Sequence, residues 1–589
     1  MLAIRGFFAS SGIRVLVDMS LISIHSKQKT LEMHDLLQEM GSTIVLEQCI
    51  EDPGKRNRLS NDEDIYRVLK SNMGTPIVQA ILVNRSMIEN LQLKRADFKK
   101  MSNLMWLSVN GGLGIVRKTL LLVDDSFLPR YLPASLDLPN SLHYLNWELY
   151  PWKSLPSSFS PENLVELHMP WSRVRKLWNE EQRLVNLKVI NLQCSYYLTE
   201  VPNLSGSPKI VHINLYFCER LVEIPGCFQH LHKLTYLNLG HCKCLKYLPE
   251  MPENIEFLDL FGSGIQELLE SVWSRDLKKL PSNRCKVKVS DCFNLCSCFS
   301  LGEFYELPTD ISELNLEFCM RIVSLPTNIC KLKYLEKLNL SRCPNLENFP
   351  NILEPIEYLK SLNLSGTAVK VLHSSIEFLP ALKTIDLEDC KRLSSIPKSI
   401  CKLKSLEQLD LNGCSALYEF PQILEPMEHL NFLSLKGTAL EKLPSSIGNL
   451  IGLQTLDLSC CKKLEVVPSS IYSLTNLKTL RFHDCQVLKE LPSGSVGLLS
   501  LEVLDLCSTR ISVIPDGLIG STSLQDVDLS GTMIRSLHAS IKQASRLHSL
   551  SLIGCKQLQS LPELPVLCHL EVQGCASLKT MSSSRAARL

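Results

Sequence analysis

The sequence predicts an α/β solenoid, in which short parallel strands stack into a horseshoe. Three observations predict it. A leucine pattern returns about every 24 residues, a small residue closes each copy, and an apolar residue followed by proline comes after it. The clearest copy is Leu335-x-x-Leu338-x-Leu340-x-x-Cys343. This is the leucine-rich-repeat pattern. No single unit can bury its apolar face, so stacking must supply the core.

The same frame can be followed through most of the chain. Forward, it returns at Leu382, Leu406, Leu453, Leu477, Leu501, Leu524 and Leu547, and it ends near Leu567. Backward, it passes Ile311, Ile255, Leu234, Ile210, Leu187 and Leu164. The gap before Ile311 is too long for one unit. We place a degenerate repeat there, with Val287 and Val289 on the strand and Cys292 as the closing residue. With it the array has roughly 18 units.

The closing residue divides the repeats into two types. Cys390 and Cys414 represent the first type, and Thr367 and Thr438 represent the second. Units closed by threonine are one residue shorter, and we expect that residue to be lost in the turn after the strand. The apolar-proline pair follows this turn. Proline lacks an N–H, which suits a convex segment outside the strand ladder. The serine-containing segment after it is expected to begin a short helical turn, with serine as its cap.

The composition is that of a folded protein, since 45% of the 589 residues are hydrophobic and 21% are charged. The net charge of +1 gives no reason to expect nucleic acid as a partner. Arg5, Arg14 and Asp18 interrupt the N-terminus, so we expect no secretory signal. No run of about 18 apolar residues predicts a membrane span. We therefore expect a cytoplasmic location, with the nucleus as a second possibility, and reduced cysteines.

Most cysteines are explained by the repeat frame. Eleven occupy the closing position, where a small side chain can lie under the turn and contact backbone groups: Cys218, Cys242, Cys292, Cys319, Cys343, Cys390, Cys414, Cys461, Cys485, Cys555 and Cys575. The alternative is a zinc site formed by Cys285, Cys292, Cys296 and Cys298. Its spacing is irregular and no histidine lies nearby in the sequence, so we expect structural cysteines and no metal.

The segment before the repeats is different in kind. Residues 13–17 and 21–24 are predicted as strands, and residues 33–41 as a helix ended by Gly41. The predicted organisation is therefore a small winged-helix-like part at 1–75, irregular first repeats or a cap at 76–140, regular repeats at 141–580, and a disordered tail at 581–589.

Three stretches carry a resemblance to a known family. The first is the run from Met33-His34-Asp35 to Gly41. The second is Asp52-Pro53-Gly54-Lys55-Arg56, followed by residues 64–69 and 74–75. The third runs from Leu142 through residues 155–167 to Trp178. With these stretches the chain resembles plant intracellular immune receptors of the TIR–NB-ARC–leucine-rich-repeat class, from near residue 13 to the end of the repeats.

The resemblance implies a nucleotide switch. In this class the Met-His-Asp histidine contacts the β-phosphate of bound ADP, which makes His34 the nucleotide-sensing residue and Asp35 its positioning partner. Full-length members bind ADP or ATP. This sequence has no Gly-x-x-x-x-Gly-Lys-Ser/Thr loop, so we expect no cofactor for this chain alone. Asn57 and Ser60 also depart from the family's usual serine and tryptophan.

The function expected from the sequence is that of a receptor fragment. Its repeats would recognise a pathogen effector or a guarded host protein and would hold the switch closed. We expect no enzymatic activity, because the family's NAD-cleaving TIR domain, the phosphate-binding loop, the Gly-x-Ser-x-Gly elbow and the His-Glu-x-x-His pair are all missing. A generic repeat adaptor of another pathway is the alternative.

The residue between the two inward leucines of each strand is expected to face the concave surface. In order along the chain, this row reads Asn315, Asn339, Asn363, Asp386, Asp410, Ser434, Asp457, Arg481, Asp505, Asp528 and Ser551. One interpretation is that these side chains only satisfy strand edges and water. The other is an acidic stripe that binds a basic protein surface, with Phe432 and His483 flanking it.

Overall fold

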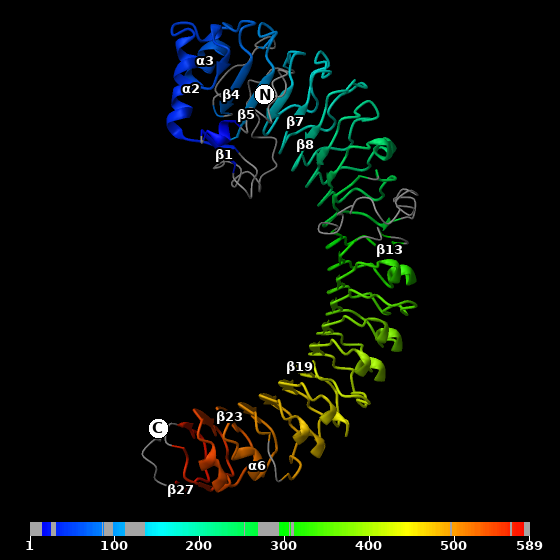
Figure 1. Cartoon of the computed structure of the whole chain (residues 1–589), viewed down its shortest axis with the longest axis vertical. Coiled ribbons are helices and arrows are strands. Elements are labelled where there is room, and N and C mark those ends of the chain that lie inside the picture. The colour runs from blue at the N-terminus through cyan, green and yellow to red at the C-terminus, as the bar shows by residue number, and fades with distance from the viewer. Residues whose placement is uncertain are drawn as a thin grey trace. The chain divides into compact units, whose positions relative to one another are not determined.

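The computed structural model describes residues 15–19, 21–24, 31–84, 86, 98–111, 136–252, 254–268, 294–304, 307, 311–494, 498–565 and 568–581. The chain forms two compact units. Unit 1 comprises Met1–Ile265 and Ser271–Arg284, and unit 2 comprises Gln266–Glu270 and Cys285–Leu589. Within each unit, short strands follow one another along the stack (Figure 1).

From residue 58 on, the described strands of unit 1 form a parallel sheet in which each strand pairs with the next along the chain. They are β3 (Arg58–Leu59), β4 (Ala80–Asn84), β5 (Trp106–Asn110), β6 (Tyr144–Trp147), β7 (Glu166–His168), β8 (Val189–Asn191), β9 (His212–Asn214), β10 (Tyr236–Asn238) and β11 (Phe257–Asp259). The predicted parallel solenoid is thereby confirmed for this unit.

Unit 2 repeats the same arrangement in a longer sheet. Its strands are β14 (Glu313–Asn315), β15 (Lys337–Asn339), β16 (Ser361–Asn363), β17 (Thr384–Asp386), β18 (Gln408–Asp410), β19 (Phe432–Ser434), β20 (Thr455–Asp457), β21 (Thr479–Arg481), β22 (Val503–Asp505), β23 (Asp526–Asp528), β24 (Ser549–Ser551) and β26 (His569–Glu571). Two short parallel pairs join β12 (Glu267–Leu268) to β13 (Glu303–Phe304), and β25 (Ser560–Leu561) to β27 (Thr580–Met581).

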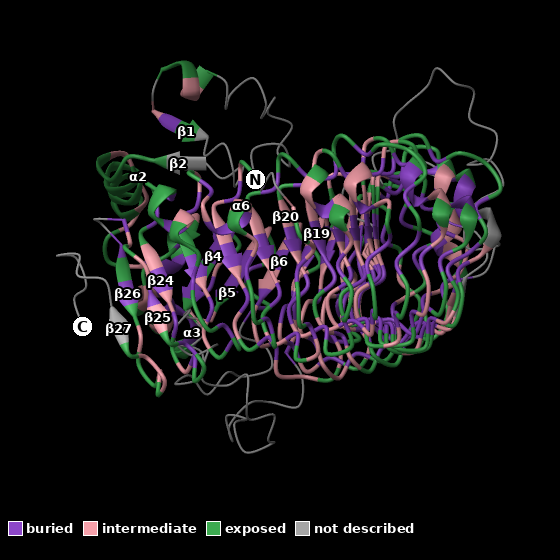
Figure 2. Cartoon of the chain, turned by 90° about the horizontal axis from the view of Figure 1, so that it is seen from below, coloured by how far each residue is buried: buried purple, intermediate pink, exposed green. Residues whose placement is uncertain are grey.

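The three-residue strands follow directly from the leucine spacing. Side chains alternate along a strand, so the middle residue points inward while its neighbours point to the outer face of the sheet. Leu409 and Leu456 are middle residues, and both are buried. The leucine that follows each strand, such as Leu411, is buried as well. Figure 2 shows this buried interior running along the stack, with exposed residues at the turns.

A shared turn follows the strands. Asn339 ends β15, and its Oδ1 accepts the N–H of Ser341 at 3.0 Å. Arg342 then takes a φ of 56°, the left-handed region that favours glycine, and glycine occupies the matching position at Gly413, with a φ of 75°. The ladder continues through the turn, since the N–H of Arg342 reaches the carbonyl of Ser365 at 2.7 Å.

The closing residues make the backbone contacts that the sequence predicted, in two different ways. The Cys343 thiol donates to the carbonyl of Leu316 in the preceding repeat, with an Sγ–O distance of 3.1 Å. The Thr367 hydroxyl donates to the carbonyl of Leu364 in its own repeat at 2.7 Å. Cysteine therefore links neighbouring units, whereas threonine closes its own turn.

The buried closing cysteines should be chemically unreactive in the folded chain. Burial raises the pKa of Cys461 to about 11 and that of Cys343 to about 12, and the thiolate is the reactive form. We expect iodoacetamide at pH 8 to label the exposed Cys244 while Cys343 and Cys461 react only after denaturation, as read by peptide mass spectrometry. Ladder disulfides in stoichiometric yield, or labelling of Cys461 as fast as Cys244, would contradict this expectation.

Short helical turns follow six of the apolar-proline pairs and the two pairs Leu372-His373 and Leu537-His538, but serine does not cap them by its side chain. They are η4 (Gly226–His230), η8 (Thr327–Lys331), η9 (Ser374–Phe378), η10 (Lys398–Lys402), η11 (Ile447–Asn449), η12 (Ser469–Ser473), α6 (Asp516–Ile519) and η13 (Ala539–Gln543). Pro397 and Pro468 occupy the cap position without a side-chain bond, and the ring of His373 caps η9. The serine prediction was wrong because proline already fixes the entry torsion.

The degenerate repeat has a different frame from the one expected. Val287, Val289, Cys285 and Cys292 lie outside the described residues. In the described part, Asn294 bridges to Asn315, and Cys298 takes the closing position. The thiol of Cys319 accordingly reaches back to the carbonyl of Leu295 at 3.2 Å. Cys298, and not Cys292, therefore closes this unit, because the stretch between Ile255 and Ile311 is longer than one repeat and a residue count alone does not fix the frame.

The N-terminal segment departs from two expectations. Residues 15–18 are helical rather than extended, while residues 22–24 form the expected strand β1 (Ile22–Ile24), which pairs antiparallel with β2 (Leu31–Met33). Helix α2 (Asp35–Glu47) runs through Gly41 instead of ending there. A glycine ends a helix where the chain must turn left-handed; in a helix interior it only costs about 1 kcal/mol.

A buried arginine joins this helix to the first repeats. Arg56 follows η2 (Pro53–Lys55) and is 4% exposed. Its guanidinium donates to the carbonyls of Cys49 and Ile50 at 2.6 and 2.9 Å, and to the carboxylate of Asp64 in α3 (Asp62–Lys70) at 2.6 Å. The Asp-Pro-Gly-Lys-Arg run therefore connects the end of α2 to the start of the repeats.

Candidate interaction surface on the sheet of unit 2

The structure places the predicted row on adjacent strands. Asp386, Asp410, Asp457, Arg481, Asp505 and Asp528 are each the last residue of their strand. The register pairs Asp386 with Asp410, Asp457 with Arg481, and Asp505 with Asp528. Parallel strands lie about 4.8 Å apart, so like charges are neighbours at two places in this row.

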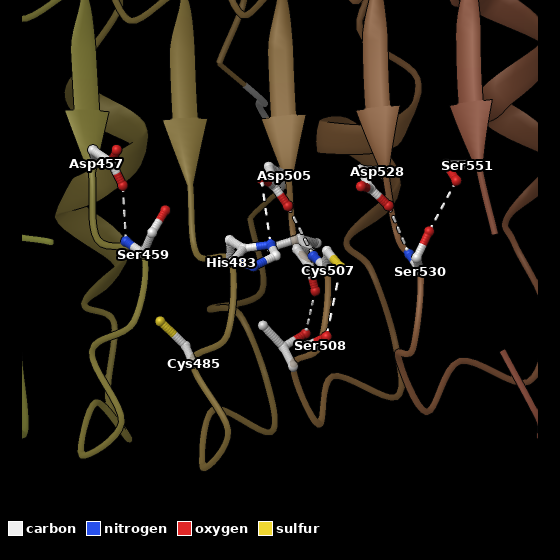
Figure 3. Close-up of polar contacts among 12 residues, drawn as sticks. Asp457, Ser459, His483, Cys485, Asp505, Cys507, Ser508, Asp528, Ser530 and Ser551 are labelled. Carbon is white, nitrogen blue, oxygen red and sulfur yellow. Dashed lines mark hydrogen bonds and ion pairs between the residues drawn. The ribbon is translucent and has the colours of Figure 1, made fainter. Parts of the chain in front are cut away.

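Every carboxylate of the row has a structural task. Oδ1 of Asp457, Asp505 and Asp528 accepts the N–H two residues further on, at 2.8, 2.9 and 2.9 Å (Figure 3). Asn339 and Asn363 make the same bond at 3.0 and 2.9 Å. These bonds fit the first interpretation, because the side chains accept backbone N–H groups just after the strands end. An uncharged amide performs that task equally well, so the turn does not account for the charge.

The surroundings of two aspartates in this row, Asp410 and Asp505, disfavour their charged form. Burial raises the pKa of Asp410, and the nearby carboxylates of Asp386 and Glu388 raise it further, against the N–H of Asn412. Burial also raises the pKa of Asp505, with Asp528 adding to the effect while the N–H of Cys507, His483 and Arg481 oppose it. The charged form of both groups is thus disfavoured relative to an exposed aspartate, and a bound cation would favour it.

The two flanking residues occupy different positions. Phe432 begins β19 and is half-buried on the same face. His483 lies two residues beyond β21, in the turn, where its Nδ1 is 3.9 Å from Oδ2 of Asp505 (Figure 3). His483 thus belongs to a second row of turn residues, which also carries Glu388 and Cys507. The row predicted from one residue per strand does not include these positions as a set, although each of them lies two residues after the last residue of a strand.

His34 and Asp35 lie at the start of α2 in unit 1. The Nδ1 of His34 accepts the N–H of Leu36 at 3.2 Å, so the ring caps the helix. Helix α2 has no buried residue, and Figure 2 shows it in the colour of exposed residues along most of its length. Its side chains Leu36, Met40 and Ile44, spaced by one helical turn, are 68%, 56% and 55% exposed. An apolar stripe of this kind belongs against another surface.

Two further findings concern metals and membranes. Within the described ranges, no group of three or more His, Cys, Asp or Glu side chains could hold a metal ion. Two of the four cysteines considered for zinc, Cys285 and Cys292, fall outside those ranges. None of the described helices combines the length and apolarity needed to cross a bilayer.

Parallel three-residue strands, a shared turn and a closing cysteine or threonine define a leucine-rich-repeat protein. The chain belongs to the plant disease resistance proteins, as the resemblance indicated. Residues 402–587 match the family model of disease resistance protein RPS4B-like leucine-rich repeats. Residues 1–49 match that of the disease resistance protein Roq1-like winged-helix domain.

Individual relatives agree. Disease resistance protein RPS6 of Arabidopsis thaliana is 33% identical over 431 residues, which cover 67% of this chain and 37% of that protein. The TMV resistance protein N of Nicotiana glutinosa is 31% identical over 462 residues, which cover 77% and 38%. A probable disease resistance protein of Arabidopsis thaliana is 32% identical, covering 98% of this chain and 37% of that protein. The chain thus spans less than two fifths of the length of these relatives.

Proposed function

We propose that this chain is the recognition part of an intracellular plant immune receptor, acting in the cytoplasm or nucleus by binding and not by catalysis. Its repeats would bind a pathogen effector or a guarded host protein. The observation that carries the proposal is the row of aspartates in unit 2, on a chain whose relatives are named for resistance. The row keeps charge that its turns do not need and that burial opposes.

The row favours a partner of basic chemistry. A Lys- or Arg-rich surface would be steered toward closely spaced carboxylates and would relieve the repulsion between like charges on neighbouring strands. Phe432 and His483 would add contacts that salt does not screen. Arg481, in register with Asp457, interrupts the acidic row and would set the position of the partner's charges along it.

His34 and Asp35 are proposed to act only in a longer protein. In this chain the ring of His34 caps α2. The sequence contains no Gly-x-x-x-x-Gly-Lys-Ser/Thr loop that could bind the phosphates. The proposal is that the exposed face of Leu36, Met40 and Ile44 packs against the remainder of a nucleotide-binding region, where His34 would contact ADP. The repeats would then restrain that switch until a partner binds.

The acidic row is tested by changing Asp410, Asp457 and Asp505 to Asn together. Binding of the cognate partner is expected to weaken about tenfold or more, and cell death in a full-length receptor should fall with it. Wild-type binding should weaken as salt rises, because the Debye length is only about 10 Å at 0.1 M. The amides preserve the turn bonds, so the fold should be retained.

The matched control removes three exposed acidic groups elsewhere in unit 2: Glu465→Gln, Glu490→Gln and Asp516→Asn. It should bind the partner as the wild-type protein does.

The stability of the row variant offers a second check, and its direction can be predicted. The folded-state pKa of Asp410 and Asp505 is raised, so their charge destabilises the fold at neutral pH and this cost disappears as pH falls through the raised pKa. The row variant should therefore be at least as stable as wild type at pH 7. Equal affinity of the row variant and the control at low salt would sink the acidic-row proposal.

A further inference from the structure

A second surface, in unit 1, is built of aromatic rings. The first residues of β9, β10 and β11 stack in one row, with ring centroids 3.9 Å apart between His212 and Tyr236 and 4.3 Å apart between Tyr236 and Phe257. Earlier in the same sheet, Trp106 and Tyr144 begin β5 and β6 and stack at 3.6 Å. All five rings are partly exposed on the outer face of the sheet.

A second row lies in the turns after the same strands. Phe217 and His241 stack at 4.0 Å, and His241 meets Phe261 edge-on at 4.8 Å. The ring of Tyr216 adjoins both Phe217 and His241, at 4.8 and 5.6 Å. The last residues of the strands, Asn214 and Asn238 among them, lie between the two rows in sequence. We call these two sets of rings the aromatic rows.

Two glycines make room for the rings. A Cβ added at Gly240 would lie 2.8 Å from the ring of Tyr216, and one at Gly262 would lie 2.7 Å from the ring of His241. Contacts under about 3.4 Å are closer than van der Waals separation allows. Glycine at these two positions therefore leaves the space that the rings of Tyr216 and His241 occupy.

Across β9, β10 and β11 the aromatic rows carry little charge, whereas Glu166 begins β7 in the same row, 3.0 Å from His168. Burial lowers the pKa of His212 and of His241, which keeps both rings neutral at pH 7. Nearby, Lys243 and Glu219 neutralise each other in an ion pair of 2.7 Å. Asp259 is the acidic group between the rows, and burial raises its pKa. A partner for this surface needs no charge, in contrast to the partner proposed for unit 2.

The size of the surface suits a short segment better than a second copy of the chain. Seven strands from β5 to β11, about 4.8 Å apart, span about 29 Å, and the six residues from His212 to Phe217, which make five steps along the chain, span at most about 17 Å. Their product, about 490 Å², is below the roughly 800 Å² that each partner contributes to a stable protein interface.

The spacing between neighbouring strands matches one backbone conformation of a bound segment. A polyproline II helix rises about 3.1 Å per residue and has three residues per turn, so one turn covers about 9.3 Å. Two strand spacings cover about 9.6 Å.

The backbone carbonyls of a polyproline II helix are unpaired. Among the described residues, the hydroxyls of Tyr216 and Tyr236 have no hydrogen-bond partner and can donate to them. Stacking uses the ring faces, leaving edges on which proline rings can pack.

We propose that the aromatic rows of unit 1 bind an uncharged, proline-rich segment of a partner protein in the polyproline II conformation, lying across β9, β10 and β11. Aromatic-lined grooves are a general solution for this ligand, because the preformed helix loses little entropy on binding. The inference concerns unit 1 alone and does not depend on the acidic row of unit 2.

The probe is a fluorescent, end-capped ten-residue polyproline peptide, titrated against the full 589-residue chain by anisotropy. Saturable binding is expected, with a capped glycine-serine peptide of equal length binding at least about tenfold more weakly. Tyr236→Ala should weaken polyproline binding about tenfold, the usual scale for a central aromatic contact. Tyr236→Phe, which removes only the hydroxyl, should weaken it by a smaller factor. Tyr334→Ala, at a tyrosine of unit 2 that is 60% exposed, is the matched control and should leave binding unchanged.

Three results would overturn the proposal. They are equal affinity for the two peptides, unchanged binding by both Tyr236 variants, and self-association of the chain that Tyr236→Ala abolishes. The last would identify a second copy as the occupant. Circular dichroism checks the fold of each variant, and if Tyr236→Ala does not fold, Tyr236→Phe and Phe217→Leu decide the question.

Discussion

Arg56→Ala is expected to destabilise the junction between α2 and the first repeats by about 3–5 kcal/mol, the scale for breaking a buried ion pair from one side. The substitution leaves the carbonyls of Cys49 and Ile50 without this donor and removes the cation beside Asp64. Hydrogen exchange of the amides in η2 and α3 measures the loss, since a local opening of this size raises exchange by at least about a hundredfold.

Arg67→Ala is the matched control for this prediction. Its guanidinium is exposed and donates one bond, to the carbonyl of Glu51 at 3.1 Å. Its loss should cost less than about 1 kcal/mol. Arg56→Lys should fall between the two, because an ammonium keeps the charge but cannot reproduce the planar fork. Equal exchange in the Arg56 and Arg67 variants would show that the buried contacts do not hold this junction.

Gly452→Ala should destabilise unit 2 by about 3 kcal/mol, the upper end for a substitution that forces backbone to move. A Cβ at this position would lie 1.9 Å from the carbonyl oxygen of Glu428 and 2.5 Å from its carbon. Both atoms are backbone, so no rotamer change can relieve the contact. The urea midpoint of unfolding, followed by circular dichroism, measures the effect.

Gly226→Ala provides the comparison, because a Cβ there meets nothing within 4 Å and the residue has no positive φ. It is expected to change stability by no more than about 0.5 kcal/mol, with a small gain from the restricted unfolded chain. A Gly452→Ala protein that unfolds with the same midpoint as Gly226→Ala would mean that neighbouring repeats separate readily enough to absorb the clash.

The regular part of the fold was predictable because it depends on local periodicity. Leucines at fixed offsets must share one face, and residues such as Asp410 and Asp457 between them must take the other. The closing cysteines followed from the same frame, and their backbone contacts agree with it. The resemblance to resistance proteins could also be read from contiguous motifs. Each of these inferences needed only residues that are close in sequence.

The predictions that were wrong concern helix caps and a repeat frame, which depend on neighbouring repeats or on a long insertion. No serine side chain caps the short helical turns: proline occupies most cap positions, the rings of His373 and His538 cap two turns, and Ser446 occupies a cap position without a side-chain bond. The frame before Cys319 shifted to Cys298, because a long insertion carries no leucine pattern to keep the count.

What the sequence by itself determined is the class of fold, the family and the row of residues on the outer face of the sheet in unit 2. The tertiary structure decided what that row does. Its Oδ1 atoms close the turns of their own repeats, while its charges meet across strands that are separated by about one repeat in sequence. It also brought His212, Tyr236 and Phe257 into one stack. Both outcomes have the same physical cause: stacking in register places equivalent positions of successive repeats about 4.8 Å apart, so charges repel and rings stack.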